Sequence, residues 1–159
     1  MMVRKTIAVI GTVEGEALIL LEALARQKLR LLVVSGQQEA NLQAKEHLEM
    51  AGGAAEIEFI SCEREGCWEA DMIMVAPAAE LTPSLLEKIR TVATQKPVIR
   101  ISEDKTQYEE SLKDLLPHAR VVELKVDPQA RQICLSGQDP DASAAVKRIF
   151  ENTGYDIKT

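Results

Sequence analysis

Short apolar runs alternate with longer segments of helical periodicity along most of the chain. Several of the runs are rich in β-branched residues and stop at glycine, serine or proline, as buried strands do. Strands are predicted at Lys5–Ile10, Arg30–Val34, Glu56–Ile60, Met72–Ala76, Val98–Ile101, Val121–Leu124, Gln132–Ser136 and Tyr155–Ile157. Helices are predicted at Gly15–Lys28, Ala40–Ala51, Thr82–Val92, Gln107–Leu116 and Pro140–Asn152. The third strand alternates polar and apolar residues, which places it near a sheet edge.

This alternation of strands and helices predicts an α/β fold. The sheet is expected to be doubly wound and mainly parallel, with helices on both faces and right-handed crossovers. No internal repeat and no Pro/Gly-rich linker interrupts the pattern. Residues 1–159 are therefore expected to form a single domain that lacks an additional C-terminal helical domain.

The turn after the first strand is the first candidate for chemistry. A strand that ends in glycine and leads into a helix can hold a pyrophosphate on the backbone N–H groups at the positive end of the helix dipole. Here the turn contains Gly11, Thr12 and Val13 and reaches the helix at Gly15. A full G-x-G-x-x-G motif would need glycine where Val13 stands, so the middle glycine is missing.

Acidic residues make a second departure at the same turn. Glu14 and Glu16 lie in the region of the first helical turn, where carboxylates stabilise the helix by about 0.3–1 kcal/mol each and occupy the field that a phosphate would use. Two hypotheses stay open. Either the turn is a phosphate loop whose acids point outward, or it is a tight turn with a self-compensated helix end.

The tip of the second strand is the other diagnostic position. It reads Ser35, Gly36 and Gln37, without the acid that binds the ribose of NAD or the arginine that binds the extra phosphate of NADP. Ser35 and Gln37 could still hydrogen-bond a ribose or a phosphate. Tight NAD binding is therefore disfavoured, and the usual NADP contact is absent.

Several segments occur in the order found in one family of oxidoreductases. These segments are IGTVEGEAL (Ile10–Leu18), the turn at Ser35, EADMIMVAP (Glu69–Pro77), ARVV (Ala119–Val122) and SGQDPDA (Ser136–Ala142), followed by Val146 and Gly154-Tyr155-Asp156. Together they resemble the NADP oxidoreductases that depend on the deazaflavin coenzyme F-420, which are distantly related to pyrroline-carboxylate reductases. The resemblance covers nearly the whole chain, and it rests on order and spacing because no single motif is specific.

The resemblance implies a Rossmann-like NAD(P)-binding domain with the nucleotide across the carboxyl ends of the first, second and fourth strands. The implied cofactor contacts are Gly11, Thr12, Val13, Gly15, Ser35, Gly36, Gln37, Ala76 and Pro77. Hydride transfer is carried by the cofactor and needs no acid or base for the hydride itself, so no catalytic residue is assigned. The segment between Leu124 and Gln132 is short, and Glu103-Asp104 replaces an Asn-Pro of the family. These departures leave no evident counterpart for the residues that receive a deazaflavin.

Two functions are consistent with these features. The first is an NAD(P)-binding, oxidoreductase-like domain that takes NADP, or NAD with less support. The second is a degenerate, non-catalytic Rossmann module that binds no cofactor and acts in homodimerisation or in the regulation of a partner. Saturable nucleotide binding would separate the two.

Composition narrows the partners and the compartment. A net charge of -6 argues against nucleic acid and anionic membranes, and 3% aromatic residues argue against an aromatic binding platform. No apolar run is long enough to span a bilayer. The three cysteines cannot all pair within one chain, which suits the cytoplasm. A homodimer that covers an exposed sheet edge is a further expectation.

The remaining candidate residues favour structural roles. Cys62, Cys67 and Cys134 match neither a common zinc pattern nor a C-x-x-C redox pair, so no metal site is expected. Trp68 is expected to be a packing residue before the fourth strand. His47 is expected on a solvated helix face, and neither it nor His118 has a nucleophile elbow nearby, so a hydrolase triad has no support.

Overall fold

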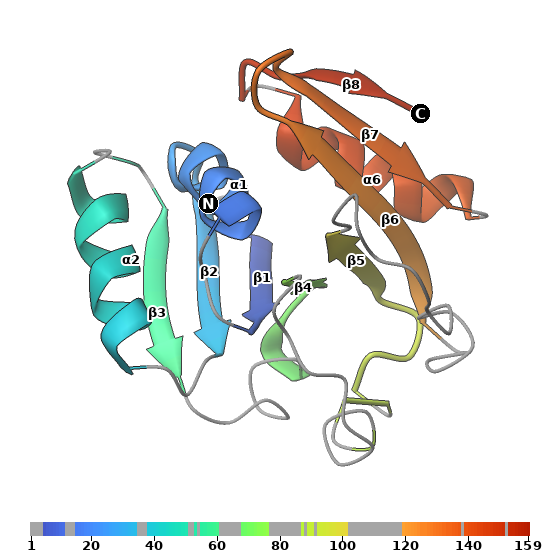
Figure 1. Cartoon of the computed structure of the whole chain (residues 1–159). Coiled ribbons are helices and arrows are strands. Elements are labelled where there is room, and N and C mark those ends of the chain that lie inside the picture. The colour runs from blue at the N-terminus through green and yellow to red at the C-terminus, as the bar shows by residue number, and fades with distance from the viewer. Residues whose placement is uncertain are drawn as a thin grey trace.

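The computed structural model describes residues 5–11, 15–34, 38–50, 53, 55–60, 68–76, 87, 89–90, 92–101, 119–137, 139–151 and 153–159. Strands among these residues form one mainly parallel sheet of order β3-β2-β1-β4-β5-β6-β7-β8 (Figure 1). Their bounds are β1 Lys5–Ile10, β2 Leu29–Val34, β3 Glu56–Ile60, β4 Met72–Val75, β5 Pro97–Ile101, β6 Arg120–Asp127, β7 Gln132–Ser136 and β8 Asp156–Lys158. The predicted α/β class is confirmed, as is the edge position of β3.

The direction of the strands changes only at the C-terminal end of the sheet. Neighbouring strands from β3 to β6 pair in parallel, whereas β7 pairs antiparallel with β6 and β8 pairs parallel with β7. A tight turn joins β6 to β7, and only an antiparallel pair can be joined by so short a connection. In this turn the Asp127 carboxylate accepts hydrogen bonds from the backbone N–H groups of Gln129 and Ala130, both at 3.1 Å.

Helices and apolar side chains cover both faces of the sheet. The helices α1 (Gly15–Ala25), α2 (Gln38–Met50) and α6 (Pro140–Phe150) contribute buried residues to a cluster that contains Ile7 and Val9 of β1. The alternate β1 residues, Ala8 and Ile10, belong to a second cluster, to which the helical Ile89 and the following Ala93 contribute. Because successive side chains of a strand point to opposite faces, the two clusters are the two layers of a doubly wound core.

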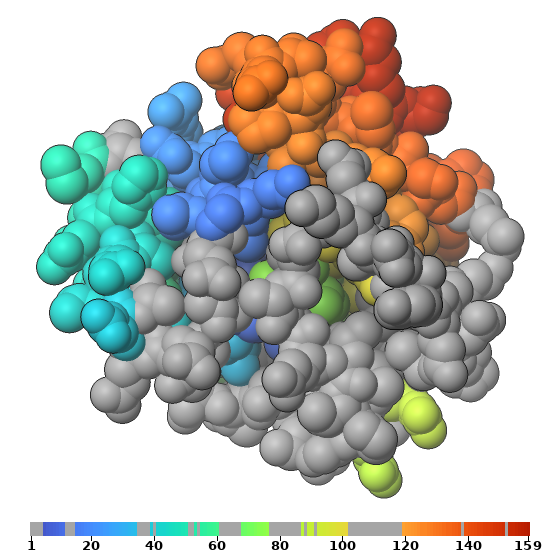
Figure 2. All heavy atoms as spheres, viewed as in Figure 1, coloured from blue at the N-terminus to red at the C-terminus, as the bar shows by residue number. Residues whose placement is uncertain are grey.

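α1 has α2 on one side and the C-terminal elements on the other. Figure 2 shows the surface of α1, in blue, between α2, in teal, and the C-terminal elements, in orange and red. The sheet twists strongly from β2 to β6, so that these strands point in very different directions (Figure 1). The twist brings Arg131, in the β6–β7 turn, to a pocket that it shares with α1.

Two predictions about single segments fare differently. Trp68 is predicted to be a packing residue before the fourth strand, and this is wrong because 69% of its surface is exposed. The buried residue just before β4 is instead Ala70, which is 3% exposed and packs in the cluster of Ile73 and Val75. The predicted helix at Gln107–Leu116 lies outside the described residues. No helix in the described part of the chain is both long enough and apolar enough to cross a membrane.

Candidate nucleotide-binding edge

The carboxyl ends of β2, β1 and β4 are joined by backbone hydrogen bonds that continue beyond the strands. The Gly11 N–H donates to the Val34 carbonyl at 3.1 Å, and the Ala76 N–H donates to the Ile10 carbonyl at 2.9 Å. These bonds fix the first residue after β1 against the end of β2, and the first residue after β4 against the end of β1. The edge on which a Rossmann-type fold binds a dinucleotide is therefore a connected unit.

Glycine is required where the chain leaves β1. Gly11 has a φ of 107°, a region that residues with a Cβ rarely adopt. The chain re-enters described structure at Gly15, which begins α1 with a φ of 55°, and a Cβ built there would meet no atom within 4 Å. The space over the start of α1 is open, so a group could approach the backbone at this point.

Glu16 brings negative charge to the same helix end. It lies in the first turn of α1 and is half-buried. Its carboxylate is favourable to the positive end of the helix dipole. An anion bound at this edge would share that dipole with Glu16, which lowers the affinity expected from the helix end alone. Glu14, the second acid considered from the sequence, lies outside the described residues.

Ala76 supplies the floor of the edge and not a contact surface. Its side chain is 2% exposed and packs in the cluster of α1 and β1. Its backbone position beside Ile10 agrees with the predicted placement at the end of β4. A larger side chain at residue 76 would have to displace this packing, because protein interiors have few voids.

Of the predicted cofactor contacts, Gly11 and Ala76 lie directly after β1 and β4, and Gly15 begins α1. The other predicted contacts lie outside the described residues: Thr12, Val13, Ser35, Gly36, Gln37 and Pro77.

The other candidate side chains bring no metal cluster together in the described part of the chain. No group of three or more His, Cys, Asp or Glu residues that could hold a metal ion occurs there. Cys134 is an exposed free thiol. His47 is exposed as expected, and its Nε2 lies 3.2 Å from Oε2 of Glu22 on α1. Cys62, Cys67 and His118 lie outside the described residues.

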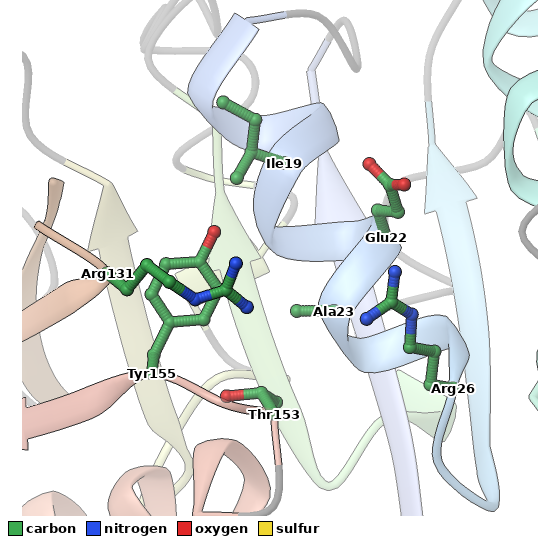
Figure 3. Close-up of a pocket in the computed structure, with 7 residues that line it drawn as sticks. All are labelled: Ile19, Glu22, Ala23, Arg26, Arg131, Thr153 and Tyr155. Atoms are coloured by element: carbon green, nitrogen blue, oxygen red, sulfur yellow. The ribbon is translucent and has the colours of Figure 1, made fainter. Parts of the chain in front are cut away.

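A pocket at the other end of α1 was missed by the sequence analysis. It has a volume of about 200 Å³ and is lined by residues of α1, the β6–β7 turn and the segment that precedes β8 (Figure 3). Among its residues are Arg26, Arg131 and Tyr155. In the sequence, Gly154-Tyr155 belongs only to a pattern that resembles a family. No local sequence signal places it near Arg26, since the two come together through the twist of the sheet.

Comparison with known proteins identifies the fold. No family model matches the sequence, and no curated protein matches it either. Solved structures do match. An NAD+-dependent dismutase, 5-formyl-3-hydroxy-2-methylpyridine 4-carboxylic acid 5-dehydrogenase, has a TM-score of 0.69 at 15% identity, over 98% of this chain and 57% of its own.

Two further similar structures are of the kinds of enzyme that the sequence resembles, and they share the fold with this chain. A protein from Arthrobacter sp. FB24, described as an F420-dependent NADP-reductase, has a TM-score of 0.65 at 15% identity, over 96% of this chain and 82% of its own. Plasmodium falciparum pyrroline carboxylate reductase with NADP bound has a TM-score of 0.62 at 13% identity, over 96% of this chain and 56% of its own. The chain therefore spans little more than half of two of these three structures. It has the Rossmann-like fold of these dehydrogenases and reductases.

Proposed function

We propose that the chain is an oxidoreductase-type domain that binds NADP(H) across the carboxyl ends of β1, β2 and β4. The observation that carries the proposal is Gly11, which is held at a φ of 107° between the end of β1 and the Val34 carbonyl. A φ of this kind is open to glycine and is rare for residues with a Cβ. The chain re-enters described structure at Gly15, the start of α1, and the N-terminal N–H groups of a helix can receive a pyrophosphate.

NADP is preferred over NAD on two grounds. The tip of the second strand carries Ser35, Gly36 and Gln37, so it has no carboxylate to accept hydrogen bonds from the ribose of NAD or to repel an extra phosphate. Two of the similar structures are described as an NADP-reductase and as an NADP complex. The same tip also lacks the arginine that binds the extra phosphate of NADP, and the dismutase is NAD+-dependent, so the titration below decides between NADP and NAD.

The residues of the edge would bind and orient the cofactor. When bound, a nicotinamide supplies the hydride or accepts it, and the protein supplies position and electrostatics. Gly11 and Gly15 would leave the backbone open to the phosphates, and Ala76 would form the small floor between β1 and β4. Glu16 limits the affinity through its charge.

The test is calorimetric titration of the purified protein with NADPH, NADP, NADH and NAD. Saturable binding with NADPH or NADP tightest supports the proposal. No heat and no thermal shift at millimolar concentrations of any of them would establish the degenerate, non-catalytic module instead. A preference for NADH and NAD would overturn the choice of cofactor.

A variant pair ties the binding to the edge. Gly11→Ala forces a Cβ into a φ of 107° and should weaken NADPH binding about tenfold, if about 1–2 kcal/mol of backbone strain is expressed in the bound loop. Asp139→Ala is the control, because it removes the N-cap of α6 and destabilises a different helix. Equal losses of affinity in both variants would show that the effect is global.

Val13→Gly restores the glycine that the motif lacks. On the phosphate-loop hypothesis it should tighten NADPH binding, because the backbone could approach the pyrophosphate more closely. On the tight-turn hypothesis it should only lower stability, since glycine loses more conformational entropy on folding. Titration and urea unfolding of the same preparation separate the two results.

A further inference from the structure

Two arginines from distant parts of the chain meet at the pocket at the C-terminal end of α1. Arg26 follows the last residue of α1, and Arg131 lies in the turn between β6 and β7. Figure 3 shows them on either side of Ala23, with Tyr155 beneath the Arg131 guanidinium. Gly15 and Arg26 are eleven residues apart, or about 16 Å along a helix, so this pocket is separate from the nucleotide edge.

The position of Arg131 is built at some conformational cost. Its φ of 52° lies in the left-handed region, which glycine and asparagine adopt more readily than arginine. Its guanidinium carbon lies 5.3 Å from the centre of the Tyr155 ring. A Cβ on Gly154 would lie 3.1 Å from the Arg131 Nη2, so the missing side chain leaves room for the guanidinium. Strain retained at a defined position is a recognised feature of functional sites.

Among the described residues, the positive charge of the pocket exceeds its negative charge. Within the described part of the chain, neither Arg26 nor Arg131 forms an ion pair with a carboxylate. Glu22 is the acid that lines the pocket, and it is engaged with His47 of α2 at 3.2 Å. Two guanidinium groups therefore face one carboxylate in a protein whose net charge is -6.

We propose that this pocket binds a small anion, a carboxylate or a phosphate monoester, between Arg26 and Arg131. Guanidinium groups bind both kinds of anion through paired N–H donors of fixed geometry. The volume of about 200 Å³ accommodates such a group with a few waters, since a water molecule takes up about 30 Å³ in the liquid. Ile19 and Ala23 give the pocket an apolar wall for the body of an organic anion.

The experiment is an NMR titration of the full chain at constant ionic strength, with inorganic phosphate in one arm and succinate in the other, and sodium chloride as the reference. Saturable shifts are expected in the amide signals of Thr153, Gly154 and Tyr155 and in the Nε–H signals of the two arginines. If only phosphate binds, the ligand is assigned as a phosphate monoester. If only succinate binds, it is assigned as a carboxylate. Saturation in neither arm overturns the proposal.

Substitutions locate the site and separate binding from folding. Arg26→Gln and Arg131→Gln should each weaken the anion about tenfold or more, the effect of a lost charged hydrogen bond. Arg90→Gln is the matched control, since it removes the same charge from an exposed helical residue outside this pocket. An equal loss of anion affinity in Arg90→Gln would show that the effect comes from net charge alone, and it would overturn the proposed site.

Arg131→Gly gives a second, independent readout. Glycine accepts the φ of 52° without strain, so the melting temperature should be unchanged or raised while anion binding is lost. An Arg131→Gly protein that still binds phosphate or succinate with unchanged affinity would contradict the role of Arg131. Signals near Gly11 monitor the nucleotide edge in the same spectra, so that binding there is not mistaken for binding in this pocket.

Discussion

Gly15 and Gly53 are needed for different reasons, and the stability of their alanine variants can measure the difference. At Gly15 the backbone is left-handed but the space around it is open, with no atom within 4 Å of a Cβ. At Gly53 a Cβ would lie 1.8 Å from the Ala25 carbonyl oxygen, a backbone atom that cannot move aside cheaply. The first position limits conformation, and the second limits how closely two segments pack.

Gly53→Ala should therefore destabilise the protein more than Gly15→Ala. The open position should lose about 1–2 kcal/mol of unfolding free energy from backbone strain. The packed position should lose more, because α1 and the segment before β3 must separate. Urea unfolding of the two variants checks this order, and a smaller loss for Gly53→Ala would contradict it.

The exposure of Trp68 allows a direct optical check. Because it is the single tryptophan of the chain and 69% exposed, its fluorescence should be red-shifted in the folded protein and strongly quenched by acrylamide. Unfolding should change the quenching little. Strong protection from acrylamide in the folded state would show instead that a partner or a second copy covers this side chain.

For single residues, the sequence predicts only those roles that a local pattern of neighbouring residues indicates. Gly11 was predicted to end the first strand because glycine after an apolar run is a stop signal, and the structure confirms that position. Arg131 was not predicted to matter. Arginine has no preference for a left-handed turn, and its partner Tyr155 is 24 residues further along (155 minus 131).

At the scale of elements, α6 has a well-defined beginning. The Asp139 carboxylate accepts hydrogen bonds from the N–H groups of Asp141 and Ala142, at 2.9 and 3.0 Å, and Pro140 occupies the first turn. Oδ2 of Asp139 also lies 3.3 Å from Nε of Arg120 on β6. A cap that bonds the helix and pairs with a strand fixes where α6 starts relative to the sheet.

Asp139→Ala should lower the unfolding free energy by about 0.5–2 kcal/mol, the usual range for loss of an N-cap. Asp139→Asn keeps an acceptor for the N–H groups and removes only the ion pair, which is partly exposed and worth little. The Asn variant should therefore retain most of the stability. Thermal or urea unfolding of both variants is the measurement, and equal losses would assign the effect to the ion pair.

The strands were predictable to the extent that they are buried on both faces. β4 is a continuous apolar run and β1 is apolar from Ile7 to Ile10, and both strands were located within one residue. β6 was predicted to end at Leu124 but continues to Asp127, because Val126 is buried while Lys125 and Asp127 are exposed. This extension pairs only with β7, and a half-exposed strand has a weaker signal than a buried one.

At the scale of the molecule, the larger core cluster joins both ends of the chain. It contains Leu20, Leu21 and Leu24 of α1 together with Val146, Ile149 and Phe150 of α6. The side chain of Gln27, just after α1, also donates a hydrogen bond to the Ile149 carbonyl. Residues more than 100 positions apart therefore share one interior, which should unfold as one unit.

Phe150→Ala tests this unity. Phe150 is fully buried, and its truncation should cost about 3–5 kcal/mol. The loss should appear equally in circular dichroism and in hydrogen exchange of β1 amides, although β1 is far from Phe150 in sequence. Leu42→Ala, at a position 60% exposed, should change stability by less than about 0.5 kcal/mol. Unchanged protection of β1 in Phe150→Ala would show that the C-terminal part unfolds separately.

The contact between α1 and α6 also sets an order of events during synthesis. The ribosome releases β1, α1, β2 and α2 first, and these can pack together, but the contact between α1 and α6 forms only after residues 140–150 have emerged. For most of the time that the chain is being made, the part of α1 that α6 covers therefore lacks this partner. Long-range contacts of this kind slow folding and expose aggregation-prone intermediates. α6 thus completes a part of the interior that α1 begins.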